Sequence, residues 1–176
     1  LKVVNETIEQ TATVDIDPQA QHIALPDPAD LLPPEGVHYR GAFAPARDET
    51  ILMHHRLPLV LRFARANRID QCTMGDESAR FGLVSAGKAY QDTRQALAYL
   101  GVDDARARTM GLALYKVGMV WPLEPVGLKE FAAGKAELFF IEEKAAFVER
   151  QAAATLYNEA ARPRIVGASL TRPRIG

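Results

Sequence analysis

The chain has 176 residues and a formal net charge of −1, with 48% apolar and 24% charged residues. This length suits one ordinary domain, and the balanced composition excludes wholesale disorder and fibrous structure. The near-zero charge disfavours electrostatic capture of nucleic acid or of an anionic membrane, so we expect neither as a partner. The single cysteine excludes an internal disulfide and any thiolate cage for a metal built by this chain alone.

Neither a membrane span nor a secretory signal is recognisable. No apolar run approaches the roughly 20 residues needed to cross a bilayer, and no basic segment followed by an apolar core opens the chain. These features predict a cytoplasmic protein. The chain begins at Leu1 rather than methionine and is patterned from the start, so we expect it to be a piece of something longer.

Residues 1–50 differ from the rest in charge and in proline content. They carry nine acidic and three basic residues, against 13 acidic and 18 basic residues in the remainder. Five prolines lie between 26 and 45, where their missing backbone donor and extended geometry predict a linker without regular structure. Alternating apolar and polar residues predict a strand over 12–17, and 22–25 predicts a second short strand. We interpret 1–50 as an extended, acidic, proline-rich arm that completes a preceding domain or lies across its surface.

A regular pattern begins at residue 51, and we assign 51–170 to one α/β domain and 171–176 to a tail. Helical spacing of apolar residues predicts a first helix that ends near Asn67. Pro58 either lies in the first turn of this helix or kinks a longer helix begun near Glu49. Five apolar segments then predict strands, at residues 71–75, 81–86, 112–117, 138–141 and 164–167. Further helices are predicted over 89–100, 127–133 and 145–159.

Strands that alternate with helices predict parallel βαβ units in a three-layer α/β/α sandwich. The first two strands are the exception, because only about five residues separate Gly75 from Phe81, too few for a crossover. These two strands should therefore be antiparallel. The fourth strand, 138–141, is continuously apolar, which predicts a central position with both faces buried.

Functional surfaces of open parallel sheets gather beyond the carboxyl ends of the strands, and three loops leave the predicted sheet there. The apolar loop 119–123 contains the only tryptophan of the chain, and exposed aromatic residues are typical of interfaces. We therefore predict an interface rim that docks against another domain or protomer. The alternatives are that Trp121 packs into its own core and that Glu142, Glu143 and Lys144 form a helix-capping or solvated turn. The rim comprises Gly87, Lys88, Tyr90, Met119, Trp121, Glu142, Glu143 and Lys144.

No catalytic, cofactor-binding or metal-binding residue can be assigned from spacing. The Gly87-Lys88 turn matches neither the dinucleotide-binding fingerprint nor the phosphate-binding P-loop, so a plain strand-to-helix turn is favoured over a nucleotide site. Cys72 lies in a short strand that we predict to be buried, which favours a structural thiol over a nucleophile. The alternative function left open is a free-standing nucleotide- or acyl-carrier-binding module that uses the Gly87-Lys88 turn.

Several runs of the sequence resemble the 2-oxoacid:ferredoxin oxidoreductases. Residues 82–97, GLVSAGKAYQDTRQAL, are similar to a strand–glycine–helix segment of that family. The resemblance extends over 114–125, 140–144 and 149–151, and the arm is similar to the stretch after the family's thiamine-pyrimidine domain. It is strongest with the large, fused indolepyruvate ferredoxin oxidoreductase of bacteria.

The resemblance implies a fold like the transketolase C-terminal domain, with a five-stranded mixed sheet whose first strand is antiparallel. It also implies a parent enzyme that oxidatively decarboxylates 2-oxoacids, here aryl pyruvates, to acyl-CoA. Such enzymes use thiamine diphosphate with magnesium, coenzyme A as co-substrate and [4Fe–4S] clusters that pass electrons to ferredoxin. Other domains and protomers of the same enzyme, in a homo-oligomer, are the partners that the resemblance implies.

The chain departs from that pattern where the cofactors would bind. It has no Gly-Asp-Gly followed by Asn for magnesium diphosphate, and one cysteine cannot ligate a cluster. We therefore expect a segment that is inactive on its own and binds no cofactor. Its expected task is to hold the cofactor-bearing domains and subunits of an oxidoreductase together.

Overall fold

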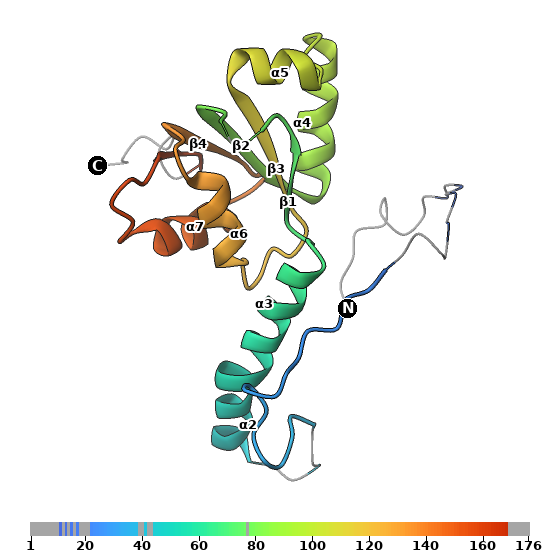
Figure 1. Ribbon diagram of the computed structural model, residues 1–176, viewed down its shortest axis with the longest axis vertical. Coiled ribbons are helices and arrows are strands. Elements are labelled where there is room, and N and C mark those ends of the chain that lie inside the picture. The colour runs from blue at the N-terminus through green and yellow to red at the C-terminus, as the bar shows by residue number, and fades with distance from the viewer. Residues whose placement is uncertain are drawn as a thin grey trace.

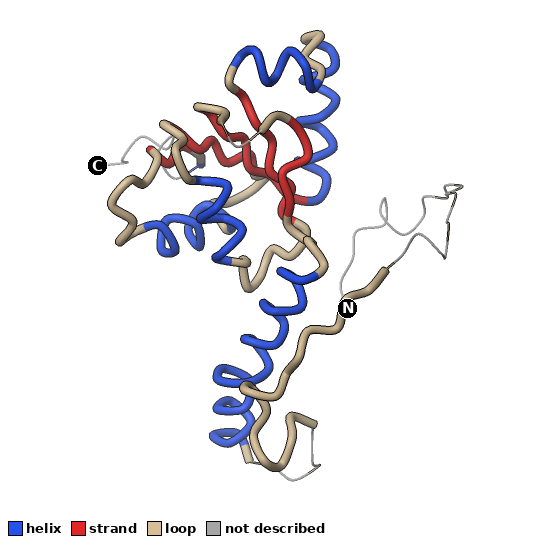
Figure 2. Tube along the Cα trace, in the orientation of Figure 1, coloured by secondary structure: helices blue, strands red, loops and turns tan. Residues whose placement is uncertain are grey.

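A computed structural model describes residues 22–38, 41, 44–76 and 78–168, together with residues 11, 13, 15 and 17. Five strands form one sheet in the order β1-β3-β2-β4-β5. The strands are β1 (Gln71–Met74), β2 (Phe81–Ala86), β3 (Leu112–Val117), β4 (Glu137–Ile141) and β5 (Arg164–Val166). Helices α4 (Gly87–Tyr99) and α5 (Asp104–Met110) lie on one face, and α6 (Pro125–Ala132) and α7 (Val148–Leu156) on the other (Figure 1). The predicted three-layer α/β/α architecture is thus confirmed (Figure 2).

The sheet is mixed, as predicted, because β1 runs antiparallel to β3 and the other pairings are parallel. The predicted antiparallel direction of the first two strands is correct, but β1 and β2 are not neighbours, since β3 lies between them. The segment that connects β1 to β2 passes the start of β3, where Phe81 N–H donates to the Gly111 carbonyl at 2.9 Å. A Cβ at Gly75 would lie 2.2 Å from the Leu112 carbonyl oxygen, so only glycine fits this approach.

Alternation along the strands sends side chains into two cores. On the α6 and α7 face, Tyr115 packs with residues such as Leu128, Phe131 and Leu138. On the α4 and α5 face, Leu114 packs with Leu97 and others. The prediction that 138–141 is central and buried on both faces is wrong. The central strand is β2, and Phe139 of β4 is 40% exposed.

The first helix is longer than its apolar pattern indicated. It runs from α2 (Pro45–Ile51) through a π-helical turn, η1 (Leu52–Arg56), into α3 (Leu57–Ala66). The second alternative for Pro58, a longer helix, is therefore the one observed, with a start before Glu49. Leu57 N–H donates to the Leu52 carbonyl five residues back, directly before the proline, whose missing N–H interrupts the α-helical ladder.

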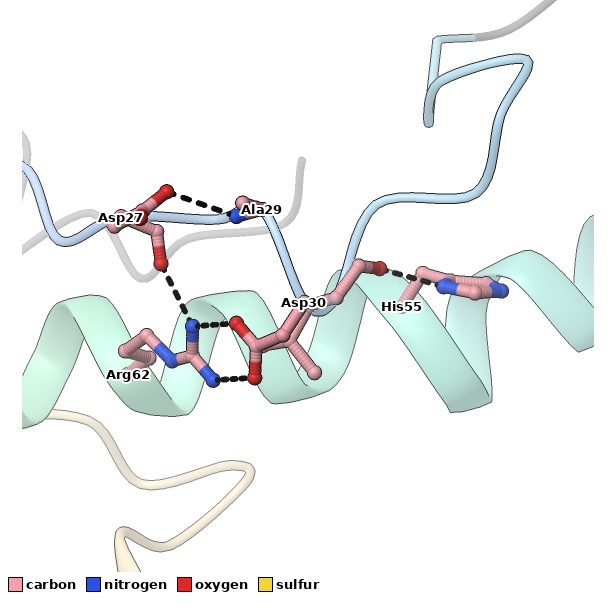
Figure 3. Close-up of polar contacts among 6 residues, drawn as sticks. Asp27, Ala29, Asp30, His55 and Arg62 are labelled. Atoms are coloured by element: carbon pink, nitrogen blue, oxygen red, sulfur yellow. Dashed lines mark hydrogen bonds and ion pairs between the residues drawn. The ribbon is translucent and has the colours of Figure 1, made fainter.

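Residues 22–38 lie along this helix and contain neither strand nor helix (Figure 1). The second short strand predicted at 22–25 is therefore absent, and three of the positions on which the strand at 12–17 depends lie outside the described residues. Instead, the side-chain amide of Asn67 binds both backbone groups of Ala24. Its oxygen accepts from the Ala24 N–H at 2.8 Å, and its nitrogen donates to the Ala24 carbonyl at 2.9 Å. Arg62 donates to both carboxylate oxygens of Asp30 (Figure 3). Side chains at the helix thus hold residues 22–38 through hydrogen bonds to the backbone of this segment and to one of its carboxylates.

One helix was not predicted from sequence. Helix α5 is only seven residues long and has no apolar stripe from which a helix could be predicted. Its signals are at its ends: the Asp103 side chain accepts from Arg106 N–H at 2.8 Å, and Gly111 ends the helix with a φ of +66°. Among the described residues, no helix is long and apolar enough to span a bilayer.

Candidate functional site

The predicted rim begins where β2 turns into α4. Ala86 is extended, and Gly87 turns the chain with a φ of +53°, so that α4 starts without a connecting loop. Lys88 is exposed and forms an ion pair with Asp92 one helical turn later. The ammonium group is therefore engaged by a carboxylate, which does not favour the nucleotide-binding alternative at this turn.

The loop with Trp121 is fixed from two sides. The Asp70 carboxylate accepts from the N–H groups of Gly118 and Met119, at 2.7 and 3.0 Å. Gln151 of α7 donates to the Val120 carbonyl at 2.8 Å and accepts from a neighbouring loop N–H. A Cβ at Gly118 would lie 2.5 Å from the Ile69 carbonyl, so glycine lets the loop pass close to residues 69 and 70. Trp121 itself is 54% exposed, which excludes the alternative that it packs into its own core.

Glu142 directly follows β4 and caps the next helix. Its carboxylate accepts from three successive N–H groups at the start of α7, at 3.0, 2.8 and 3.1 Å. A carboxylate at this position satisfies free donors and faces the positive end of the helix. The capping alternative for Glu142 is thus observed, while Glu143 and Lys144 are exposed beside it.

A cavity of about 300 Å³ joins the three loops of the rim. Its walls come from the start of α4, from the tryptophan loop and from the segment after β4, and include Gly87, Lys88, Val120, Glu142, Glu143 and Phe147. Val120 and Phe147 are 44% and 51% exposed, so together with Trp121 they make the rim apolar as well as polar. Such a mixture is typical of a protein–protein contact surface.

Two predicted positions need correction. Tyr90 is buried and packs in the core against Leu97 and Leu114, with Lys116 over its ring, so it does not contribute an exposed aromatic group. Cys72 was predicted to be buried, but it is exposed, because β1 is an edge strand. Met119 is half-buried below the loop whose tryptophan is exposed.

Asp70 and Gln151 were missed by sequence reasoning, although they hold the tryptophan loop. Each lies far from the loop along the chain and binds its backbone, so no spacing in the sequence pairs them. The signal available for Asp70 was weak: one carboxylate directly before a predicted strand. Gln151 lies within a run that resembles the oxidoreductase family, without any indication of a role.

The chain also resembles known proteins. The family model for the indolepyruvate oxidoreductase domain matches residues 71–174. Subunit IorA of the indolepyruvate oxidoreductase from Thermococcus kodakarensis is 31% identical over 101 residues, which cover 57% of this chain and 14% of that subunit. The corresponding subunit from Pyrococcus abyssi is 31% identical over 102 residues, with the same coverage. The chain therefore spans about one seventh of the length of these curated relatives.

Two solved structures resemble parts of the chain at lower similarity. One is a split-gene transketolase in an inactive β4 tetramer, with a TM-score of 0.40 and 14% identity over 56% of this chain and 31% of that chain. The other is the 2-oxoglutarate:ferredoxin oxidoreductase from Magnetococcus marinus, with a TM-score of 0.41 and 17% identity over 72% of this chain and 21% of that chain.

The match to the family model places the α/β fold described above in an oxidoreductase domain family. Because the family model covers more than half of the residues, the chain belongs to the indolepyruvate oxidoreductase domain family.

The donor groups of this chain do not fit the cofactors that the family implies. A [4Fe–4S] cluster is held by four cysteine thiolates, and the chain has one cysteine. Among the described residues, no group of three or more His, Cys, Asp or Glu side chains is placed to hold a metal ion such as the magnesium of a diphosphate.

Proposed function

We propose that this chain is a non-catalytic assembly domain of an indolepyruvate oxidoreductase, and that its rim docks against another domain or protomer of the parent enzyme. The observation that carries the proposal is that Trp121 is exposed on a loop that hydrogen bonds hold in place. An exposed tryptophan on a loop bound by Asp70 and Gln151 loses little conformational freedom on docking. The apolar residues beside it, Val120 and Phe147, widen the contact.

In this proposal the chemistry resides elsewhere in the parent enzyme. The parent, a cytoplasmic homo-oligomer of the large fused type, oxidatively decarboxylates aryl pyruvates and passes electrons to ferredoxin. It holds thiamine diphosphate, magnesium and [4Fe–4S] clusters in other domains and uses coenzyme A as co-substrate. The family membership supports this assignment, and the single cysteine supports the placement of the clusters outside residues 1–176.

Calorimetric titration of the 176-residue chain with thiamine diphosphate and magnesium tests the non-catalytic part of the proposal. We expect no saturable heat, and no reduction of ferredoxin when indolepyruvate and coenzyme A are added. A titration that saturates at micromolar thiamine diphosphate would overturn it. The full-length enzyme, titrated in parallel, is the positive control.

A further inference from the structure

A groove of about 390 Å³ lies between α4 and β4, on the face of the sheet opposite α6 and α7 (Figure 1). Most of its lining is apolar and includes Leu83 of β2, Leu97 and Leu100 of α4, and Ile141 at the end of β4. Its volume lies in the range of ligand-binding pockets. The groove is therefore large enough to hold several side chains of a docked segment.

The sheet continues this apolar surface beside the groove. In the parallel register, Phe139 of β4 pairs with Leu83 of β2 and with Val166 of β5, so the three side chains point to the same face. Leu83 packs against the core on the α4 side, which places Phe139 and Val166 on that side as well. Phe139 is 40% exposed and Leu100 is 70% exposed. Large apolar side chains exposed together are typical of a surface that another segment covers.

The charged side chains of the groove are all carboxylates. Asp92 is paired with Lys88, and both oxygens of Glu142 accept from N–H groups at the start of α7. Glu143 is exposed and makes no ion pair with any residue that the structure describes. Among the described residues, the lining includes neither lysine nor arginine. The groove therefore favours an occupant that combines apolar side chains with positive charge.

The chain itself leaves the sheet beside this groove. Ala168 lies two residues beyond Val166, as Ile141 lies two residues beyond its registered partner Phe139. The end of β5 therefore brings the chain to the level of Ile141, one strand spacing of roughly 4.8 Å from β4. Residues 169–176 follow and lie outside the described residues. Extended, they span up to about 27 Å, whereas the 13 residues of α4 span about 20 Å.

The composition of residues 169–176, SLTRPRIG, is complementary to the groove. Arg172 and Arg174 are its charged side chains, both positive, while Leu170 and Ile175 are apolar. The match to the indolepyruvate oxidoreductase domain also continues past β5 to residue 174. Most of this segment thus belongs to the unit that the family shares.

We propose that residues 169–176 dock in this groove and cover the exposed side of β4. The two apolar side chains of the segment would lie on Phe139 and Leu100, and one of its arginines would form an ion pair with Glu143. The occupant is a segment of this chain, so the proposal does not rest on the assembly role of the rim.

Methyl NMR tests the proposal by comparing the 176-residue chain with a chain that ends at Ala168. We expect removal of the segment to shift the signals of two groove residues, Leu100 and Ile141. The signals of Leu128 and Leu156, in the core on the other face, should stay unchanged and report an intact fold. Identical groove signals in the two chains would overturn the proposal. Groove signals of the 176-residue chain that vary with protein concentration would also overturn it, because they indicate a second copy as the occupant.

Charge variants of the 176-residue chain separate docking from the loss of residues. Arg172→Glu combined with Arg174→Glu should move the groove signals toward those of the shorter chain. Addition of Glu143→Arg to this double variant restores opposite charges and should return the signals toward those of the unmodified chain. Arg150→Glu, at an exposed position of α7 on the other face, is the matched control and should leave them unchanged. Unchanged groove signals in the double variant would contradict the proposed ion pair.

Discussion

The Asp70 carboxylate accepts a 3.0 Å hydrogen bond from the N–H of Met119, which lies 49 residues further along the chain. The same oxygen accepts from Gly118 at 2.7 Å. This contact ties the segment that leaves α3 to the loop that displays Trp121. The orientation of the tryptophan therefore depends on a residue at the junction between the long helix and the sheet, as well as on Gln151 of α7.

Asp70→Ala should loosen the tryptophan loop. Two loop N–H groups lose their acceptor, so we expect a loss of about 1–2 kcal/mol in the free energy of unfolding by urea. Quenching of Trp121 fluorescence by acrylamide should rise. Asp70→Asn keeps an oxygen acceptor and is the matched control, expected to preserve the quenching of the unmodified chain. Equal quenching in the alanine variant and the unmodified chain would contradict the anchoring role.

Glu142 and Glu143 offer a pair of adjacent carboxylates with different tasks. Glu142→Ala removes the acceptor of three N–H groups at the start of α7 and should cost about 1 kcal/mol of stability. Glu143→Ala removes an exposed side chain and should change stability by less than about 0.5 kcal/mol. Thermal denaturation of both variants makes the comparison. The capping role fails if the two melting temperatures fall equally.

The contact between the arm and α3 should weaken only in strong acid. Two hydrogen bonds from Arg62 hold the pKa of Asp30 well below the ordinary value of 3.8, to about 2 (Figure 3). A lowered pKa means that the folded state favours the ionised carboxylate. The contribution of this pair to stability is therefore complete above about pH 4 and is lost as the pH falls through about 2.

The carboxyl carbon of Asp30, followed by NMR from pH 6 to pH 1.5, reports this titration directly. In the Arg62→Ala variant its midpoint should return toward the ordinary value of 3.8. An unchanged midpoint in that variant would show that another group sets the pKa.

The fold was largely predictable because its strands and helices have strong local patterns. The five apolar strand segments and the mixed sheet follow from hydrophobicity and from the short connection after Gly75. The neighbours of β1 did not follow, because a short connection fixes direction but not which strand lies alongside. The exposure of Phe139 was equally hidden, since a continuous apolar run does not reveal which of its side chains stay exposed in the folded chain.

The rim was predicted as a set of loops, and the structure brings Gly87, Val120 and Glu142 to one cavity. What sequence could not supply were long-range contacts to the backbone, such as those of Asp70. Tyr115 occupies an apolar strand and looks like core, and its unpartnered hydroxyl is visible only when the residues around it are placed.

Docking of the rim is the central claim, and Trp121→Ala in the full-length enzyme tests it most directly. Sedimentation velocity of the purified enzyme should show weakened association, with a loss of about 2 kcal/mol or more for an aromatic anchor. The 176-residue chain with the same substitution should keep its melting temperature, because Trp121 is exposed. Unchanged assembly of the full-length variant, or unfolding of the shorter chain, would contradict the account.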